Sequence, residues 1–127
     1  MRRLALALAC TLVAHAAHAF GPATNYALHC QGCHLADGSG MPGKVPPLDG
    51  ALGRLAATRE GRAYLARVPG VANAPLGDAE LAALLDWTLR RFAGAADAAP
   101  FTATEVGALR SAPLADVAAA RAKLLGR

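Results

Sequence analysis

Cys30-Gln31-Gly32-Cys33-His34 is the most specific chemical pattern in this chain. Two residues separate the cysteines, so on one helical turn the two thiols match the two attachment points of a haem macrocycle. The histidine follows directly, which lets its imidazole reach the iron of the same macrocycle. In an exported protein the pattern predicts one haem c, covalently attached through Cys30 and Cys33, with His34 as the metal ligand.

The same residues have two other interpretations. The cysteines could form a redox-active or structural disulfide, or they could be half of a zinc site. A thioredoxin-like disulfide needs a βαβ setting, and this sequence has no strand-rich pattern. A zinc site needs four ligands. His29 is the remaining neighbour, but it is adjacent to Cys30 and therefore a poor tetrahedral partner. Haem attachment is the preferred interpretation.

The N-terminus predicts a cleaved signal peptide over residues 1–19. Arg2 and Arg3 precede an apolar run over residues 4–14, and Ala17-His18-Ala19 is an A-x-A cleavage site. The run is shorter than the ~20 apolar residues of a spanning helix, so we expect a periplasmic protein with no membrane span after cleavage. Cys10 raises the alternative of lipid attachment, but the residues before it do not resemble a lipobox.

Charge and composition narrow the class of protein. Removing 19 of the 127 residues leaves 108, a length typical of one domain. Without Arg2 and Arg3 the chain has 11 basic and 9 acidic residues, a net charge of +2. The arginines are scattered and only 5% of residues are aromatic, so nothing indicates a nucleic-acid partner. Alanine dominates the apolar residues and builds a thin core, so we expect the apoprotein to be poorly folded.

The residue pattern predicts an all-α fold with long loops. We expect helices over residues 23–33, 51–57, 59–67 and 78–93, and a Gly- and Pro-rich loop over 35–50. The helix over 78–93 has the clearest periodicity, carried by Leu81, Leu84, Leu85, Leu89 and Phe92.

A short helical extension is expected after a small-residue linker at residues 94–100. Thr102 and Glu105 have the spacing of a capping box that opens one helix. Ser111-Ala112-Pro113 interrupts it, and a second helix is expected over 114–125, because Pro disfavours the helical interior. The predicted organisation is therefore a main domain over 20–94 and a C-terminal helical extension over 95–127.

Residues 21–92 resemble the class I cytochromes c, in particular small bacterial monohaem ones. In that family a glycine begins the first helix and an aromatic residue lies four positions before the first haem cysteine, as Gly21 and Tyr26 do here. Val45-Pro46-Pro47-Leu48 is similar to the family's G-P-x-L segment. The last helix has the family's E-x-x-x-L-x-x-W pattern, in Glu80, Leu84 and Trp87.

The resemblance implies a cytochrome c-like helical domain wrapped around one covalent haem. It also implies that the backbone carbonyl of Pro46 accepts a hydrogen bond from the ring of His34 and so orients this ligand.

The sequence departs from the family at the sixth iron ligand. The family usually has a methionine shortly before the last helix, whereas residues 71–75 read Val-Ala-Asn-Ala-Pro. Met41, the one methionine outside the predicted signal peptide, lies in the loop after His34. Four interpretations stay open: Asn73, Met41, water, or no sixth ligand.

The resemblance implies an electron carrier and not an enzyme. Electrons would come from a periplasmic dehydrogenase and pass to another cytochrome, a copper protein or an oxidase.

One alternative is a haem-bearing accessory subunit of a dehydrogenase complex, docked through the extension. The extension has an apolar strip of Leu109, Val117, Leu124 and Leu125, which could equally pack on the protein's own surface. The other alternative is a haem ligand sensor with an open distal site.

Overall fold

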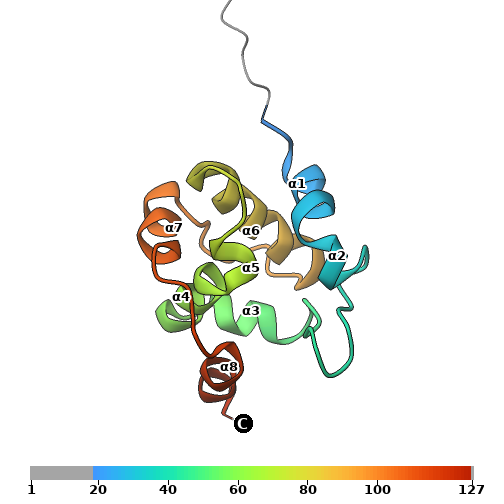
Figure 1. The fold of residues 1–127 in the computed structure, drawn as a ribbon, viewed down its shortest axis with the longest axis vertical. Helices are drawn as coiled ribbons and strands as arrows, with labels where there is room; N and C mark the ends of the chain where they lie inside the picture. The colour runs from blue at the N-terminus through green and yellow to red at the C-terminus, as the bar shows by residue number, and fades with distance from the viewer. Residues whose placement is uncertain (1–18, 127) are drawn as a thin grey trace, which may run out of the picture.

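The computed structural model describes residues 19–126. The predicted signal peptide, with Cys10, lies outside the described residues except for Ala19. The described chain is built from eight helices joined by loops (Figure 1), and the expected all-α fold is confirmed. The helices are α1 Pro22–His29, α2 Gln31–His34, α3 Ala51–Ala56, α4 Arg59–Arg67, α5 Pro69–Ala72, α6 Asp78–Phe92, α7 Ala103–Arg110 and α8 Val117–Leu125. Within this range β-pairing is limited to an isolated bridge between Met41 and Val45.

Three boundaries differ from the sequence prediction. The helix expected over 23–33 is broken at Cys30, whose φ of −122° leaves the helical region. A short helix that the sequence analysis did not include, α5, begins at Pro69, because proline suits the first helical position. The last helix starts at Val117 and not at 114, because the side chain of Asp116 caps it by accepting from the Ala119 N–H.

Half of the predicted capping box forms at the start of α7. The hydroxyl oxygen of Thr102 accepts from the backbone N–H of Glu105 at 3.1 Å. The carboxylate of Glu105 accepts instead from Arg62, at 2.8 and 2.6 Å. A long-range ion pair therefore takes the acid that the local pattern assigned to the helix cap.

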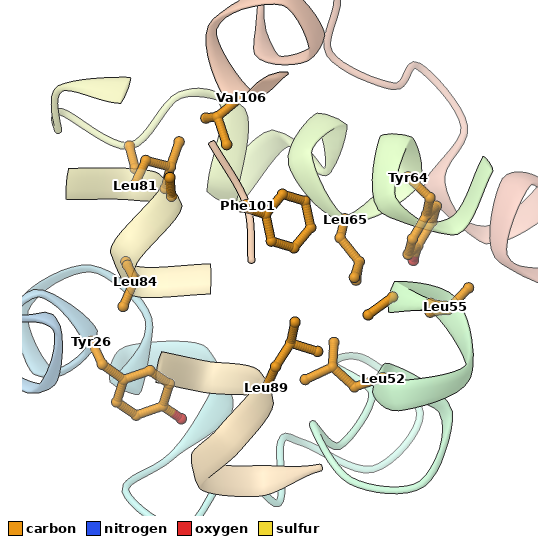
Figure 2. Packing of buried hydrophobic residues seen from close by; sticks show 13 residues of the cluster. Tyr26, Leu52, Leu55, Tyr64, Leu65, Leu81, Leu84, Leu89, Phe101 and Val106 are labelled. Atoms are coloured by element: carbon orange, nitrogen blue, oxygen red, sulfur yellow. The ribbon is translucent and has the colours of Figure 1, made fainter. Parts of the chain in front are cut away.

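Helix α6 lies at the centre, with α1 on one side and α7 on the other (Figure 1). Leu81, Leu84 and Leu89 point from α6 into the hydrophobic core, and Tyr26, Leu52, Leu55, Tyr64 and Leu65 meet them from α1, α3 and α4 (Figure 2). Phe101 and Val106, which follow the linker, enter the same core and are 5% and 0% exposed. Burial of this apolar surface is the main source of stability.

Arg62 ties the linker and α7 to the rest of the protein. Its guanidinium donates to the carbonyls of Ala99 and Pro100 at 2.7 and 3.2 Å, in addition to the Glu105 pair. It also lies over the ring of Phe101, 3.9 Å from the ring centroid. The segment after residue 94 is therefore anchored by hydrogen bonds, an ion pair and core packing together.

Helix α8 packs on α3 and α4 at the end of the described chain (Figure 1). Of the predicted apolar strip, Val117, Leu124 and Leu125 contact the protein's own core. None of the described helices has both the length and the apolar character needed to cross a membrane.

Candidate haem-binding site

A cavity of about 300 Å³ lies between the α1–α2 segment, the loop over residues 35–50 and the helices that follow. Cys30, Cys33, His34 and Pro46 all line it. The four residues that the sequence singled out are therefore brought to one cavity. Its remaining wall is mostly apolar, formed by Leu52, Leu65, Val68, Val71, Ala74, Leu81, Leu84 and Leu85.

The break between α1 and α2 places both thiols and the imidazole on one turn. The backbone N–H groups of Cys33 and His34 both donate to the carbonyl of Cys30, at 3.1 and 2.9 Å. Leu35 then ends α2 with a positive φ of 61°, which is uncommon for a residue other than glycine. The hydroxyl of Tyr26 donates to the Leu35 carbonyl at 2.6 Å and holds this turn.

Tyr26 also fixes the attachment segment to α6. Its ring centroid lies 5.3 Å from that of Trp87 and 5.0 Å from that of Phe92. Trp87 and Phe92 meet edge to face at 5.7 Å. Tilted and edge-to-face arrangements are favoured geometries for aromatic rings. The cluster therefore positions α1 against α6 on one side of the cavity.

The loop after α2 folds back so that Pro46 reaches the cavity. Gly40 donates to the His34 carbonyl at 3.1 Å, and Met41 and Val45 exchange two backbone hydrogen bonds at 2.9 and 2.8 Å. Gly40 has a φ of +72°, and a Cβ there would collide with the carbonyl oxygens of Val45 and Pro46. Glycine is needed at this position for both reasons.

Burial favours the uncharged forms of His34 and Cys30. Burial lowers the pKa of His34, and the nearby carbonyl of Pro46 opposes this effect. The Nδ1 atom of His34 is buried and has no partner at standard hydrogen-bond geometry, but the Pro46 carbonyl is close enough to act on its pKa. Burial, with the neighbouring Cys33, raises the pKa of Cys30 to about 11.

These properties disfavour a redox-active disulfide and a zinc site. Redox-active C-x-x-C pairs have a lowered thiol pKa, whereas that of Cys30 is raised. Among residues 19–126 no group of three or more His, Cys, Asp or Glu side chains could hold a metal ion, and His29 is exposed on α1. A buried imidazole nitrogen, two thiols on the same turn and an apolar wall together fit a flat apolar cofactor.

The two candidates for a protein sixth ligand are not brought to this cavity. Asn73 is exposed on the segment between α5 and α6, and Met41 is half-buried in the bridge with Val45. The cavity wall contains neither residue.

Two basic residues at the cavity were missed by the sequence analysis. Lys44 and Arg121 line it, together with Tyr64, and all three also line an adjoining hollow. Arg121 lies one helical turn after Val117 on α8, so both face the cavity. Helical spacing relates these two residues to each other, but nothing in the sequence places α8 beside the haem motif. The two positive charges suit the carboxylates of a haem.

Arg110 was also missed, although it fixes part of the cavity wall. Its guanidinium donates to the backbone carbonyls of Ala72, Ala74 and Leu76, at 3.0, 2.5 and 2.8 Å, and pairs with Asp78 at 3.2 Å. Three carbonyls of the segment between α5 and α6 are thereby bonded to one side chain of α7.

No protein-family model matches the chain. Two curated proteins are similar to it, both called Cytochrome c-552, one from Thermus thermophilus and the other from a specified strain of the same species. Each is 36% identical over an alignment 118 residues long, and the alignment covers 75% of this chain and 90% and 80% of the two relatives. The similarity therefore covers about 95 of the 127 residues, which is more than the stretch over 21–92 that carries the family's motifs.

Proposed function

This chain belongs to the small class I monohaem cytochromes c, and from that premise we propose that it is a periplasmic carrier of single electrons. It would take electrons from a periplasmic dehydrogenase and pass them to a downstream cytochrome, copper protein or oxidase. The observation that supports this most directly is the cavity that Cys30, Cys33, His34 and Pro46 share.

We assign each of these residues a role towards the cofactor. Cys30 and Cys33 hold it covalently, His34 ligates its iron, and the Pro46 carbonyl orients the imidazole. Lys44 and Arg121 balance its carboxylates. A bound haem supplies one-electron chemistry by cycling its iron between two oxidation states. The aliphatic wall keeps water from the cofactor, and no side chain has to act as an acid, a base or a nucleophile.

The surface beside the attachment turn suits brief contact with a redox partner. Cys33 is exposed, so the cofactor edge that it holds would lie near solvent. Leu28 and Leu35 flank the motif in the sequence and are 59% and 42% exposed. Small exposed apolar contacts are typical of weak electron-transfer complexes, which bury little surface.

The segments predicted from the sequence remain part of the proposal. We assign residues 1–19 to a cleaved signal peptide, 20–94 to a cytochrome c domain and 95–127 to a helical extension. Three of the four residues in the strip proposed for docking an accessory subunit pack against the protein's own core, which favours the carrier over the accessory-subunit alternative.

The attachment chemistry is tested by mass spectrometry of the protein matured in a host that exports and assembles cytochromes c. We expect the mass of residues 20–127 plus one haem. In the pyridine haemochrome spectrum, Cys33→Ala should show one thioether fewer than the wild type. Gln31→Ala, between the cysteines, is the matched control and should keep both thioethers. A matured wild-type protein without covalent haem would contradict the proposal.

A further inference from the structure

The groups that ligate haem iron in cytochromes c are imidazole and thioether, and this chain has few of them. Its histidines are His15, His18, His29 and His34, and its methionines are Met1 and Met41. Three of these six fall within the predicted signal peptide. His29 is exposed on α1, and the backbone of Met41 is bonded to Val45 away from the cavity wall. Of these six histidines and methionines, His34 is the residue that lines the cavity.

Most of the side chains that line the cavity from α4, α5 and α6 are hydrocarbon. Leu65, Val68, Val71, Ala74 and Leu81 line it from α4, α5, α6 and the residues that connect these helices. Thr88 also lines it, but its hydroxyl donates to the carbonyl of Leu84 at 2.8 Å and is already used.

Arg110 prevents the segment between α5 and α6 from supplying a ligand by moving inward. The connection is short, because α5 ends at Ala72 and α6 begins at Asp78. The carbonyls of Ala72, Ala74 and Leu76 are bonded to Arg110, and Ala72 and Ala74 are 6% and 8% exposed. A largely buried arginine with several charge-assisted hydrogen bonds is costly to displace. The segment therefore keeps Ala74 at the cavity wall and Asn73 in solvent.

Resting on the proposed function, we propose that this chain gives its haem one protein ligand, His34, and leaves the second axial position to small uncharged diatomic molecules such as carbon monoxide or nitric oxide. The aliphatic part of the wall admits uncharged molecules and does not offset the desolvation of an anion. The two cations at the cavity, Lys44 and Arg121, are already assigned to the haem carboxylates. Bound gas would hold the iron in one oxidation state, so the carrier would stop transferring electrons while the gas is present.

The test uses the matured wild-type protein, with its mass confirming that residues 1–19 have been removed. The optical spectrum of the dithionite-reduced protein is recorded with and without carbon monoxide. We expect a five-coordinate, high-spin spectrum that carbon monoxide converts to a six-coordinate one. A low-spin spectrum that carbon monoxide leaves unchanged would overturn the inference. A reversible redox couple in that same sample would still support the proposed function. If no reversible couple is seen, both the proposed function and this inference are wrong.

Two variants test the role of the cavity segment. Ala74→Met places a thioether on the wall, and we expect a low-spin spectrum, a sulfur-to-iron charge-transfer band after oxidation, and loss of the carbon monoxide response at a concentration that saturates the wild type. Asn73→Met is the matched control on the exposed side of the same segment and should keep the wild-type response. A low-spin spectrum in Asn73→Met would show that Arg110 does not hold the segment, and would contradict the proposal.

Lys44 and Tyr64 also line the cavity, and their amine and phenol groups could ligate iron. If the wild-type spectrum is six-coordinate and Lys44→Gln or Tyr64→Phe makes it five-coordinate, that residue is the sixth ligand and the inference is wrong. A wild-type spectrum that is already five-coordinate excludes both residues as ligands and supports the inference.

Discussion

Gly40 shows at the scale of one residue how the loop shapes the site. Gly40→Ala adds a Cβ that collides with the carbonyls of Val45 and Pro46, besides placing a side chain at a φ of +72°. Gly43 has the same φ of +72° but no atom within 4 Å of the added Cβ. We expect Gly43→Ala to lower the free energy of unfolding by about 1–2 kcal/mol, the cost of a left-handed conformation, and Gly40→Ala to lower it further. Denaturant unfolding of the haem-loaded proteins measures the loss in each variant. Equal losses in Gly40→Ala and Gly43→Ala would show that the added Cβ at residue 40 does not collide with the carbonyls.

Arg121 is a second test at this scale. A cation near the cofactor disfavours the oxidised, more positive iron, so Arg121→Gln should lower the reduction potential by an amount on the order of tens of millivolts. Arg90→Gln removes the same charge from an exposed position on α6 that does not line the cavity, and should change the potential less. Spectroelectrochemistry compares the two, and equal shifts would show that Arg121 acts only through net charge.

At the scale of elements, the link between α4 and α7 should be sensitive to acid. Arg62 holds the pKa of Glu105 below its ordinary value, mainly through their hydrogen bonds. Because the folded-state pKa is lowered, the stabilisation is complete above the unfolded pKa of about 4.3 and is lost as pH falls through the lower folded value. The free energy of unfolding should therefore decline with acid in this range, and decline less in Glu105→Gln. Identical pH dependence in the two proteins would contradict the pairing.

The packing of the segment after the linker is a further element-scale prediction. Phe101 is 5% exposed in the core and stacks with Arg62. Phe101→Ala should cost about 3–5 kcal/mol, the range for large core truncations. Leu124→Ala, on the half-buried α8, should cost less. Thermal unfolding of both variants measures the two losses of stability. A larger loss in Leu124→Ala than in Phe101→Ala would show that α8 contributes more to stability than the packing of Phe101.

Local patterns predicted most of the helices, because periodicity and caps act within a few residues. The helix over 59–67 matches α4, and the strong stripe of leucines placed α6. The break at Cys30 and the start of α5 depend on geometry that periodicity does not record. The pairing of Arg62 with Glu105, and the three carbonyls held by Arg110, join residues 34 to 43 positions apart, so no local signal indicated them.

The same distinction applies to the site. Cys30, Cys33 and His34 could be proposed from the sequence because their chemistry is contained in five consecutive residues, and the structure places all three at one cavity. Lys44, Arg121 and the segment held by Arg110 were not, because their place at the cavity comes from tertiary packing. The sequence showed that a methionine is missing, whereas the structure shows what lines the cavity in its place.

At the scale of the whole molecule, we expect folding to depend on the cofactor. Apolar residues from α3, α4, α5 and α6 surround the 300 Å³ space, and without a haem they lose their packing partner. A Cys30→Ala, Cys33→Ala protein without haem should have weak near-UV circular dichroism and a broad thermal transition. A sharp transition with strong near-UV signals would show that the polypeptide core is sufficient.

The most direct test of the central claim is an optical redox titration of the matured protein, from fully oxidised to fully reduced and back. A one-haem electron carrier predicts a haem c spectrum that follows a single one-electron Nernst curve, the same in both directions. A spectrum without haem c, or a haem that is not reversibly reduced, would contradict the account.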